Sequence, residues 1–212
     1  MVVTILPAAQ PAWAQSGADR QQEVEMALDH YTEAKTPDQR SAVTDYLGHL
    51  DRKLVAAAVI DHIIASRNGA EATAYNELLE AFAPDACTAV LDRLGKTDQA
   101  TPKGKLIVAL RHCQGDEPLH ALTACLDDKR PVSFEAHGAH PRRVCDLAYD
   151  ELFLKLRNDP RYGLDPTARM KELIGAKTPI KTRDALIAKL KSKLAAPAPS
   201  ATRSSLPTCT YT

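Results

Sequence analysis

The chain has 212 residues, and its 27 lysines and arginines balance its 27 aspartates and glutamates, so its formal net charge is zero. A hydrophobic share of 44% with 25% charged residues excludes wholesale disorder, and the lack of any long apolar run excludes a multi-span membrane protein. Zero charge also argues against a general nucleic-acid binder, which normally carries a basic excess. Aromatic residues make up only 5% while alanine and leucine are abundant, which favours an all-α fold.

The first fourteen residues carry no charge and end in Ala12-Trp13-Ala14, the small-x-small pattern that signal peptidases accept. Residues 1–14 therefore indicate a signal peptide or apolar leader, and we expect an exported protein, periplasmic or secreted. No lysine or arginine precedes this segment, and Pro7 and Pro11 interrupt it, so a cytoplasmic protein is the alternative.

Residues 17–194 are expected to form one folded helical domain. Its first segment, 17–36, predicts a capping helix with Val24, Leu28 and Tyr31 on one face. Residues 195–212 are rich in proline, serine and threonine and predict a disordered tail.

A short segment recurs along the domain at intervals of 31 and 32 residues. Its copies are Ala58–Ile63, Ala89–Leu94 and Ala121–Leu126, and they follow turns that contain Asp51, Asp85 and Asp116. An acidic residue in such a turn can accept the free N–H groups at the start of a helix. An apolar helix end precedes each turn, so the predicted unit is a hairpin of two helices, and stacked hairpins share a core. An irregular helical bundle is the alternative.

The third unit resembles a known family. The segment Gly115–Asp128 resembles the second helix of a HEAT-like (armadillo-type) repeat, and Arg142–Ala148 resembles the first helix of the following repeat. Gly115 suits a left-handed turn, Asp116 a helix cap and Pro118 a first helical turn. The resemblance implies a short α-solenoid of stacked antiparallel helical hairpins, with a concave face that binds a protein or peptide.

Five cysteines are present and none forms a CxxC pair, so zinc-ribbon and thioredoxin-like motifs are absent from the sequence. In a stacked array Cys113 lies near Cys87 at one edge, and Cys125 lies near Cys145 at the opposite edge. If the chain is exported, we expect disulfides Cys87–Cys113 and Cys125–Cys145, each joining adjacent repeats. The alternative is that all four are small buried apolar residues. Cys209 is expected to be free or intermolecular.

Four histidines lie close to these cysteines in the sequence, namely His112, His120, His137 and His140. The last two have a spacing that a transition metal can chelate, but no second chelating pair accompanies them. Solvated loop histidines are the simpler interpretation, and no metal or cofactor is expected. A metal-binding protein or an enzyme that uses residues 112–145 is the alternative.

Residues 131–141 interrupt the repeat where a two- or three-residue turn would suffice. Long loops inserted into helical arrays are usually functional or disordered. The candidate contact surface for a partner consists of Phe134, Glu135, His137, His140, Arg142 and Arg143. A neutral insertion is the alternative.

Charge is distributed unevenly along the chain. Residues 16–50 contain seven acidic and three basic residues, whereas residues 176–194 contain six basic residues against Asp184. The final helix, 179–194, is expected to close the stack with one apolar face, made of Leu186, Ile187, Leu190 and Leu194. Its lysine-rich face predicts a solvated surface or, alternatively, peripheral contact with an anionic membrane or an acidic partner.

No GxSxG, P-loop or GxGxxG motif is present in the sequence, and serines are sparse in the repeat region. We therefore expect a non-enzymatic protein- or peptide-binding or scaffold module of the cell envelope or periplasm. An immunity- or inhibitor-type protein that blocks a toxin is a further alternative.

Overall fold

The computed structural model describes residues 17–67, 69–83, 85–133, 140–164, 173–175 and 177–195. Within these ranges the chain is all-α, with one isolated β-bridge and no strand. The α-helices are α1 (Gly17–Glu33), α2 (Pro37–Gly48), α3 (Arg52–Ala65), α4 (Gly69–Glu80), α5 (Asp85–Lys96), α6 (Ala100–Ala109), α7 (Asp116–Ala124), α8 (Val144–Leu156) and α9 (Ile180–Ala195). Three short 3-10 helices accompany them, η1 (Leu110–His112), η2 (Cys125–Asp127) and η3 (Pro160–Tyr162). None of these helices has the length and apolarity needed to cross a lipid bilayer.

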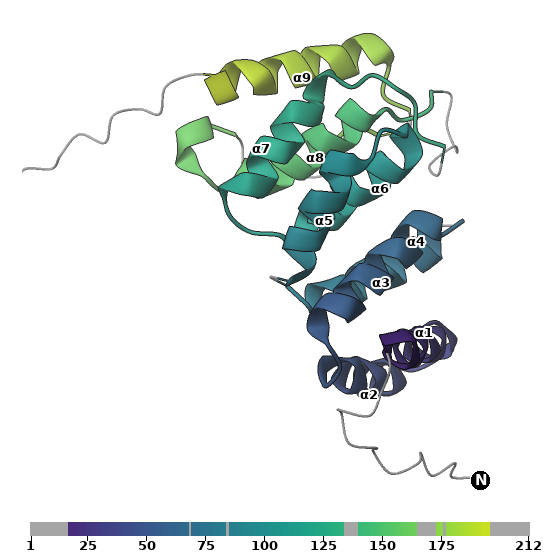
Figure 1. Cartoon of the computed structure of the whole chain (residues 1–212). Helices are drawn as coiled ribbons and strands as arrows, with labels where there is room; N and C mark the ends of the chain where they lie inside the picture. Colours follow the sequence, from purple (N-terminus) through teal and green to yellow (C-terminus); the bar gives the residue numbers. More distant parts are fainter. Residues whose placement is uncertain are drawn as a thin grey trace, which may run out of the picture.

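The helices stack in layers, from α1 and α2 at one end of the molecule to α9 at the other (Figure 1). Helix α1 packs on α2, α3 on α4, α5 on α6 and α7 on α8. Successive layers are joined by α1 with α3, α3 with α5, and α6 with α8, and α9 packs on α8. This arrangement is the all-helical, layered architecture that a stack of hairpins requires.

The hairpins that pack most closely are shifted by one helix from the predicted units. The turns at Asp51, Asp85 and Asp116 predicted pairs of α2 with α3, α4 with α5, and α6 with α7, whereas α3 packs mainly on α4 and α5, and α6 on α8. A turn determines only which helices are consecutive in the chain. Which helices pack together depends on how wide the apolar face of each helix is. Helix α3 buries enough of its circumference to contact α1, α4, α5 and α6, through Val55, Ala56, Ala58, Val59, Ile60 and Ile63.

Two of the predicted turn residues differ in their roles. Asp51 is the N-cap of α3, and its carboxylate accepts hydrogen bonds from the Lys53 and Leu54 amides at 3.0 and 3.3 Å. The sequence predicted Asp116 as the N-cap of α7, and this prediction is wrong. The N-cap is Gly115, whose φ of 98° favours glycine, and Asp116 lies in the first turn beside the positive end of the helix dipole.

Both end helices bury the faces that their periodicity predicts, and one of them adds a charged residue. In α1 the buried residues include Val24, Leu28 and Tyr31. In α9 Ile187 and Leu190 are buried, while Leu186 and Leu194 are half-buried. The sequence did not predict that Arg183 of α9 is also buried.

Helix α8 is the most enclosed element, because α6, α7, α9 and η2 all pack against it. Every residue from Val144 to Phe153 is buried, including Asp146, Asp150 and Glu151. Carboxylates at such depth need charged or hydrogen-bonding partners, and the neighbouring segments supply them.

Candidate functional site

The predicted contact surface after η2 lies partly outside the described residues and partly within the fold. Phe134, Glu135 and His137 lie outside the described residues. At the base of the insertion the chain is held to itself, since Pro131 and Arg143 form an antiparallel bridge and the Val132 amide donates to the Arg142 carbonyl at 2.8 Å. His140 is half-buried, and its carbonyl accepts a hydrogen bond from Arg183 at 3.1 Å.

The place of Arg142 and Arg143 in a contact surface stays a prediction, but both guanidinium groups also form ion pairs inside the fold. Arg142 forms an ion pair with Asp150. Arg143 pairs with Asp146 and Asp184, each at 2.8 Å. The two arginine side chains are only 13% and 10% exposed, so they neutralise carboxylates within this fold and are poorly placed to contact a partner.

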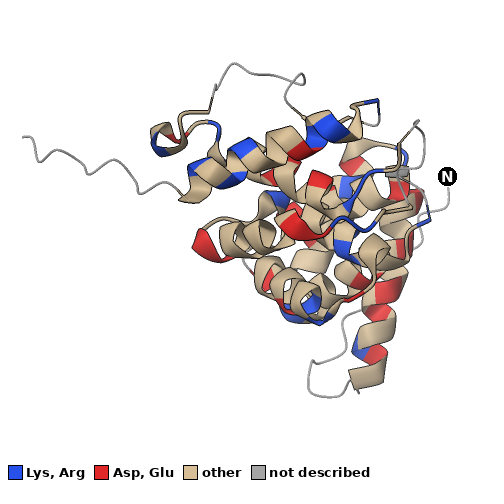
Figure 2. Cartoon of the chain, turned by 90° about the horizontal axis from the view of Figure 1, so that it is seen from above, with Lys and Arg blue, Asp and Glu red and all other residues tan. Residues whose placement is uncertain are grey.

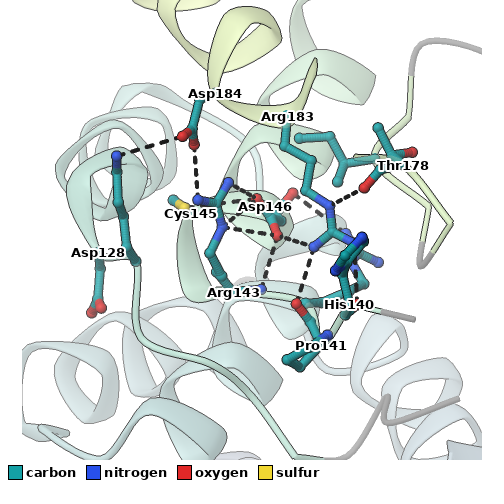
Figure 3. Close-up of polar contacts among 12 residues, drawn as sticks. Asp128, His140, Pro141, Arg143, Cys145, Asp146, Thr178, Arg183 and Asp184 are labelled. Atoms are coloured by element: carbon teal, nitrogen blue, oxygen red, sulfur yellow. Dashed lines mark hydrogen bonds and ion pairs between the residues drawn. The ribbon is translucent and has the colours of Figure 1, made fainter. Parts of the chain in front are cut away.

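A buried charge cluster at the start of α8 is the main polar feature that sequence reasoning missed (Figure 3). Arg183 is fully buried and donates to the Asp146 carboxylate at 2.7 Å. It also donates to four backbone carbonyls, at 2.8 to 3.3 Å, those of His140, Pro141, Gly175 and Thr178. One side chain therefore fastens α9, the start of α8 and the segments before each of them.

The carboxylate of Asp146 is fully engaged by this arrangement. One oxygen accepts from the Arg143 side chain, and the other accepts from the Arg143 amide and from Arg183. Burial would raise the pKa of Asp146, but the hydrogen bonds from Arg143 and Arg183 outweigh burial and hold the pKa below its ordinary value. A carboxylate that is charged and already fully hydrogen-bonded suits a structural role better than proton transfer.

Asp150, one turn further along α8, has the opposite electrostatics. Burial raises the pKa of Asp150 to about 6, although Arg142 and the Ile174 amide, which donates at 2.8 Å, both favour the charged carboxylate. The group therefore titrates above the range of an ordinary aspartate, in a place that ties α8 to residues 173–175.

The two predicted cysteine pairs also differ in outcome. The sulfurs of Cys87 and Cys113 lie at disulfide distance, 2.26 Å apart with a Cα–Cα distance of 5.4 Å, and join α5 to the end of η1. Cys125 and Cys145 are both free and buried, so the second predicted disulfide is absent. The Cys145 amide donates to the Asp128 carbonyl at 2.9 Å, which places Cys145 close to the end of η2. The Cys145 thiol, however, donates to the Asp146 carboxylate at 3.7 Å. Burial raises the pKa of Cys145 to about 11, which suppresses the reactive thiolate.

The histidines near these cysteines do not converge in the part of the chain that the structure describes. His112 lies 3.3 Å from Glu80, and His120 is exposed on α7. Among the described residues, no group of three or more histidine, cysteine, aspartate or glutamate side chains is placed to hold a metal ion. His137 lies outside those residues.

Helix α9 carries several blue bands in Figure 2, which mark its lysines and Arg183. Two of the lysines are used within the fold, because Lys191 pairs with Asp127 at 2.7 Å and Lys193 donates to the Tyr162 and Gly163 carbonyls at 2.9 and 2.5 Å. Lys181 and Lys189 are exposed. Some lysines of α9 therefore hold the helix against the rest of the protein, whereas others face solvent.

The candidate binding site is a groove of about 550 Å³ on the terminal layer, which we call the α1–α2 groove. It is lined by Asp19, Gln22, Glu23, Met26, Ala27 and His30 of α1 and by Ala42, Val43 and Tyr46 of α2. Met26 is 56% exposed and Tyr46 is 39% exposed, the highest values among large hydrophobic residues at this end of the molecule. The groove lies on a different side of α1 from the buried Val24, Leu28 and Tyr31, which pack toward the core.

A hydrogen bond between the two helices fixes the wall of the α1–α2 groove. The Tyr46 hydroxyl donates to the Glu23 carboxylate at 2.5 Å. This hydrogen bond, together with burial, raises the pKa of Tyr46 to about 12. Because the hydroxyl is satisfied at the rim, the ring is free to offer its apolar surface to a ligand.

A second cavity of about 540 Å³ lies between η1, the start of α7 and α8. Three of its charged side chains form contacts across the cavity wall: Arg111 bonds Glu151 at 2.5 Å, and Lys155 donates to the Arg111 and Cys113 carbonyls at 3.0 and 2.6 Å. Burial lowers the pKa of Lys155. These contacts join η1 to α8, so the lining of this cavity is better explained by stability than by ligand binding.

Comparison of the chain with protein-family models, with curated proteins and with solved structures finds no match. The α1–α2 groove is therefore the feature of the molecule that best indicates a function.

Proposed function

We propose that this protein is a non-enzymatic binding module, built as a short HEAT-like stack of helical hairpins, and that it holds a segment of a partner protein in the α1–α2 groove. The observation that carries this proposal is the exposed apolar floor of the groove, in which Met26 and Tyr46 face solvent at the end of the stack. Terminal repeats of helical arrays normally present a polar outer face. An apolar groove with a polar rim at that position is typical of an interaction site.

The form of the groove favours a polypeptide ligand. The lining residues of α1 recur every three or four positions from Asp19 to His30, so the groove follows the helix over about three turns. A channel between two parallel ridges of side chains accepts an extended or helical segment that places apolar anchors along its length. A binding role also agrees with the charged groups elsewhere, since the cluster around Asp146 and the lining of the second cavity are engaged in contacts within the fold.

We further propose that the protein acts in an oxidising compartment outside the cytoplasm. Support comes from the disulfide distance between Cys87 and Cys113, since such bonds persist mainly in exported proteins. Intact mass after alkylation under denaturing conditions tests this. We expect the thiols of Cys87 and Cys113 to be labelled only after reduction, and labelling of both without reduction would contradict the proposal.

The binding role is tested by placing a photoreactive residue at position 26 in cells that make the protein. The matched control carries the same residue at position 180, because Ile180 of α9 is 48% exposed and lies at the other end of the stack. We expect a discrete crosslinked species from position 26, none from position 180, and loss of the species when Ala42→Glu is added to the groove. Equal crosslinking at both positions, or none at position 26, would contradict the proposal.

A further inference from the structure

We infer that the segment held by the α1–α2 groove is a cationic amphipathic helix of another protein. This inference rests on the proposed function and names the chemical class of its ligand. Three features carry it: the charge around the groove, the dimensions of the groove, and the mismatch of the other available occupants.

The groove is bordered by a strongly acidic pair of helices. Helix α1 contains five acidic residues and only Arg20 as a basic lysine or arginine, and α2 contains two acidic residues and only Arg40. Arg40 is turned to other parts of the molecule, since its guanidinium lies 5.9 Å from the centre of the Tyr31 ring and 3.9 Å from Glu77. Two carboxylates, Asp19 and Glu23, line the groove itself. A ligand with lysines or arginines flanking an apolar strip would complement this rim.

The dimensions suit a helix. From Asp19 to His30 the α1 side of the groove is about 16 Å long at the helical rise, which matches three turns of a ligand helix. Apolar anchors spaced by three or four residues on such a helix would meet Met26 and the Tyr46 ring in turn. The flexible thioether of Met26 adapts to anchors of different shape.

The other available occupants fit less well. A second copy bound through the same end would bring two acidic α1–α2 pairs together, and like charges at an interface oppose association. The uncharged residues 1–14 could cover the apolar floor but would leave the acidic rim unmatched. An anionic membrane surface would be repelled by the same carboxylates.

Two designed peptides test the inference on the full-length protein. Both are helical, about 18 residues long, with the same leucine positions; one carries lysine at its polar positions and the other glutamate. We expect fluorescence anisotropy to give at least tenfold tighter binding of the lysine peptide, roughly the discrimination that complementary rim charges provide. The difference should narrow as ionic strength rises.

Variants locate the binding. The double substitution Asp19→Asn/Glu23→Gln should weaken binding of the lysine peptide roughly threefold to tenfold and reduce its salt dependence, because a charge pair at a solvent-accessible rim contributes a fraction of a kcal/mol. Both amides keep an oxygen that can accept a hydrogen bond, including the one from Tyr46. Met26→Gln should weaken it further by removing an apolar anchor, whereas Ile180→Gln, outside the groove, should leave it unchanged. Circular dichroism of each variant establishes that the fold is intact.

Several outcomes would overturn the inference. Equal binding of the two peptides, a preference for the glutamate peptide, or binding of the lysine peptide that ignores the groove variants would each contradict a cationic helix in this groove. Tighter binding of a synthetic peptide of residues 1–14, or a concentration-dependent dimer that Met26→Gln abolishes, would identify a different occupant. If the photoreactive residue at position 26 still captures a partner in cells while the lysine peptide shows no preference, the binding role stands and only the ligand class fails.

Discussion

The two ends of the helical stack are closed in opposite ways. At the α8–α9 end, charged side chains point inward, and Arg183 and Asp146 meet in the interior with no exposed surface. At the α1–α2 end, apolar side chains point outward and carboxylates border them. One end is sealed by a helix of the same chain, whereas the other retains an apolar groove.

The two ends also differ in what their charged side chains contact, although the chain as a whole has no net charge. Near α9, three of the basic side chains have partners within the protein. Arg183 pairs with Asp146, Lys191 pairs with Asp127, and Lys193 donates to the Tyr162 carbonyl. Of the five acidic residues of α1, Glu25 pairs with His62 at 2.7 Å, whereas Asp19 and Glu23 line the α1–α2 groove. Equal and opposite sequence charges thus serve stability at one end and, as we propose, recognition at the other.

The largest effect should follow from breaking the sealed end. Replacing Arg183 by methionine, Arg183→Met, leaves Asp146 buried with one fewer cationic partner and removes one hydrogen-bond donor from each of four carbonyls. We expect a loss of about 3 to 5 kcal/mol in the free energy of unfolding, measured by denaturant titration. The control on the same helix, Lys189→Met at an exposed position, should stay within about 0.5 kcal/mol of the wild type. Similar losses for the two variants would contradict the proposed role of the buried pair.

A pH series sharpens the comparison further. Because burial raises the pKa of Asp150 to about 6 from an ordinary 3.8, the folded chain holds a proton between these pH values that the unfolded chain has released. The stability contributed by Asp150 is therefore fully present below pH 3.8 and is lost as the pH rises through 6.

The variant Asp150→Asn cannot titrate at this position. We expect the unfolding free energy of the wild type, relative to this variant, to fall by about 1 to 3 kcal/mol between pH 4 and pH 7. Asp116→Asn, at an exposed position in α7, serves as the control and should show no such fall. A relative stability that rises with pH would mean that the Arg142 ion pair outweighs burial.

The smallest stability effect is expected in the α1–α2 groove. Met26→Gln changes an exposed side chain and should alter the free energy of unfolding by no more than about 0.5 kcal/mol. Two positions along the same helix, Leu28→Ala should cost about 3 kcal/mol, because Leu28 is fully buried. Thermal or denaturant unfolding of both variants checks this contrast, and a large loss for Met26→Gln would make the groove a structural element.

Sequence patterns predicted the helical class and the inner faces of the end helices, since helical spacing of apolar residues directly records burial. The same spacing in α9 also indicates that Arg183 is buried. Arg183 lies four positions before Ile187 and seven before Leu190, so it shares the buried face of the helix with them. A charged residue at such a position predicts a buried ion pair, but its partner Asp146 is remote in sequence. Only the packing of α9 on α8 identifies that partner.

The α1–α2 groove could not be read from the sequence for a similar reason. Its lining combines residues of two helices that are individually unremarkable, such as Met26 on α1 and Ala42 on α2. Neither helix has a strong apolar stripe on that side, and the groove exists because the helices lie next to each other. Likewise, stacking brought Cys87 near Cys113, whereas the orientation of the Cys145 thiol toward Asp146 depends on local geometry.

The dependence of α8 on α9 has a consequence for folding during synthesis. Asp146 is buried in α8, yet the arginine that pairs with it from α9 emerges from the ribosome 37 residues later. The layers from α1 to α6 can assemble in the order in which they are made, since each contacts its predecessor. Helix α8 can pack on α6 and α7 as soon as it is made, but its buried Asp146 lacks Arg183 until α9 has followed. The α8–α9 contact would therefore be the last of these contacts to become protease-resistant on a translating ribosome.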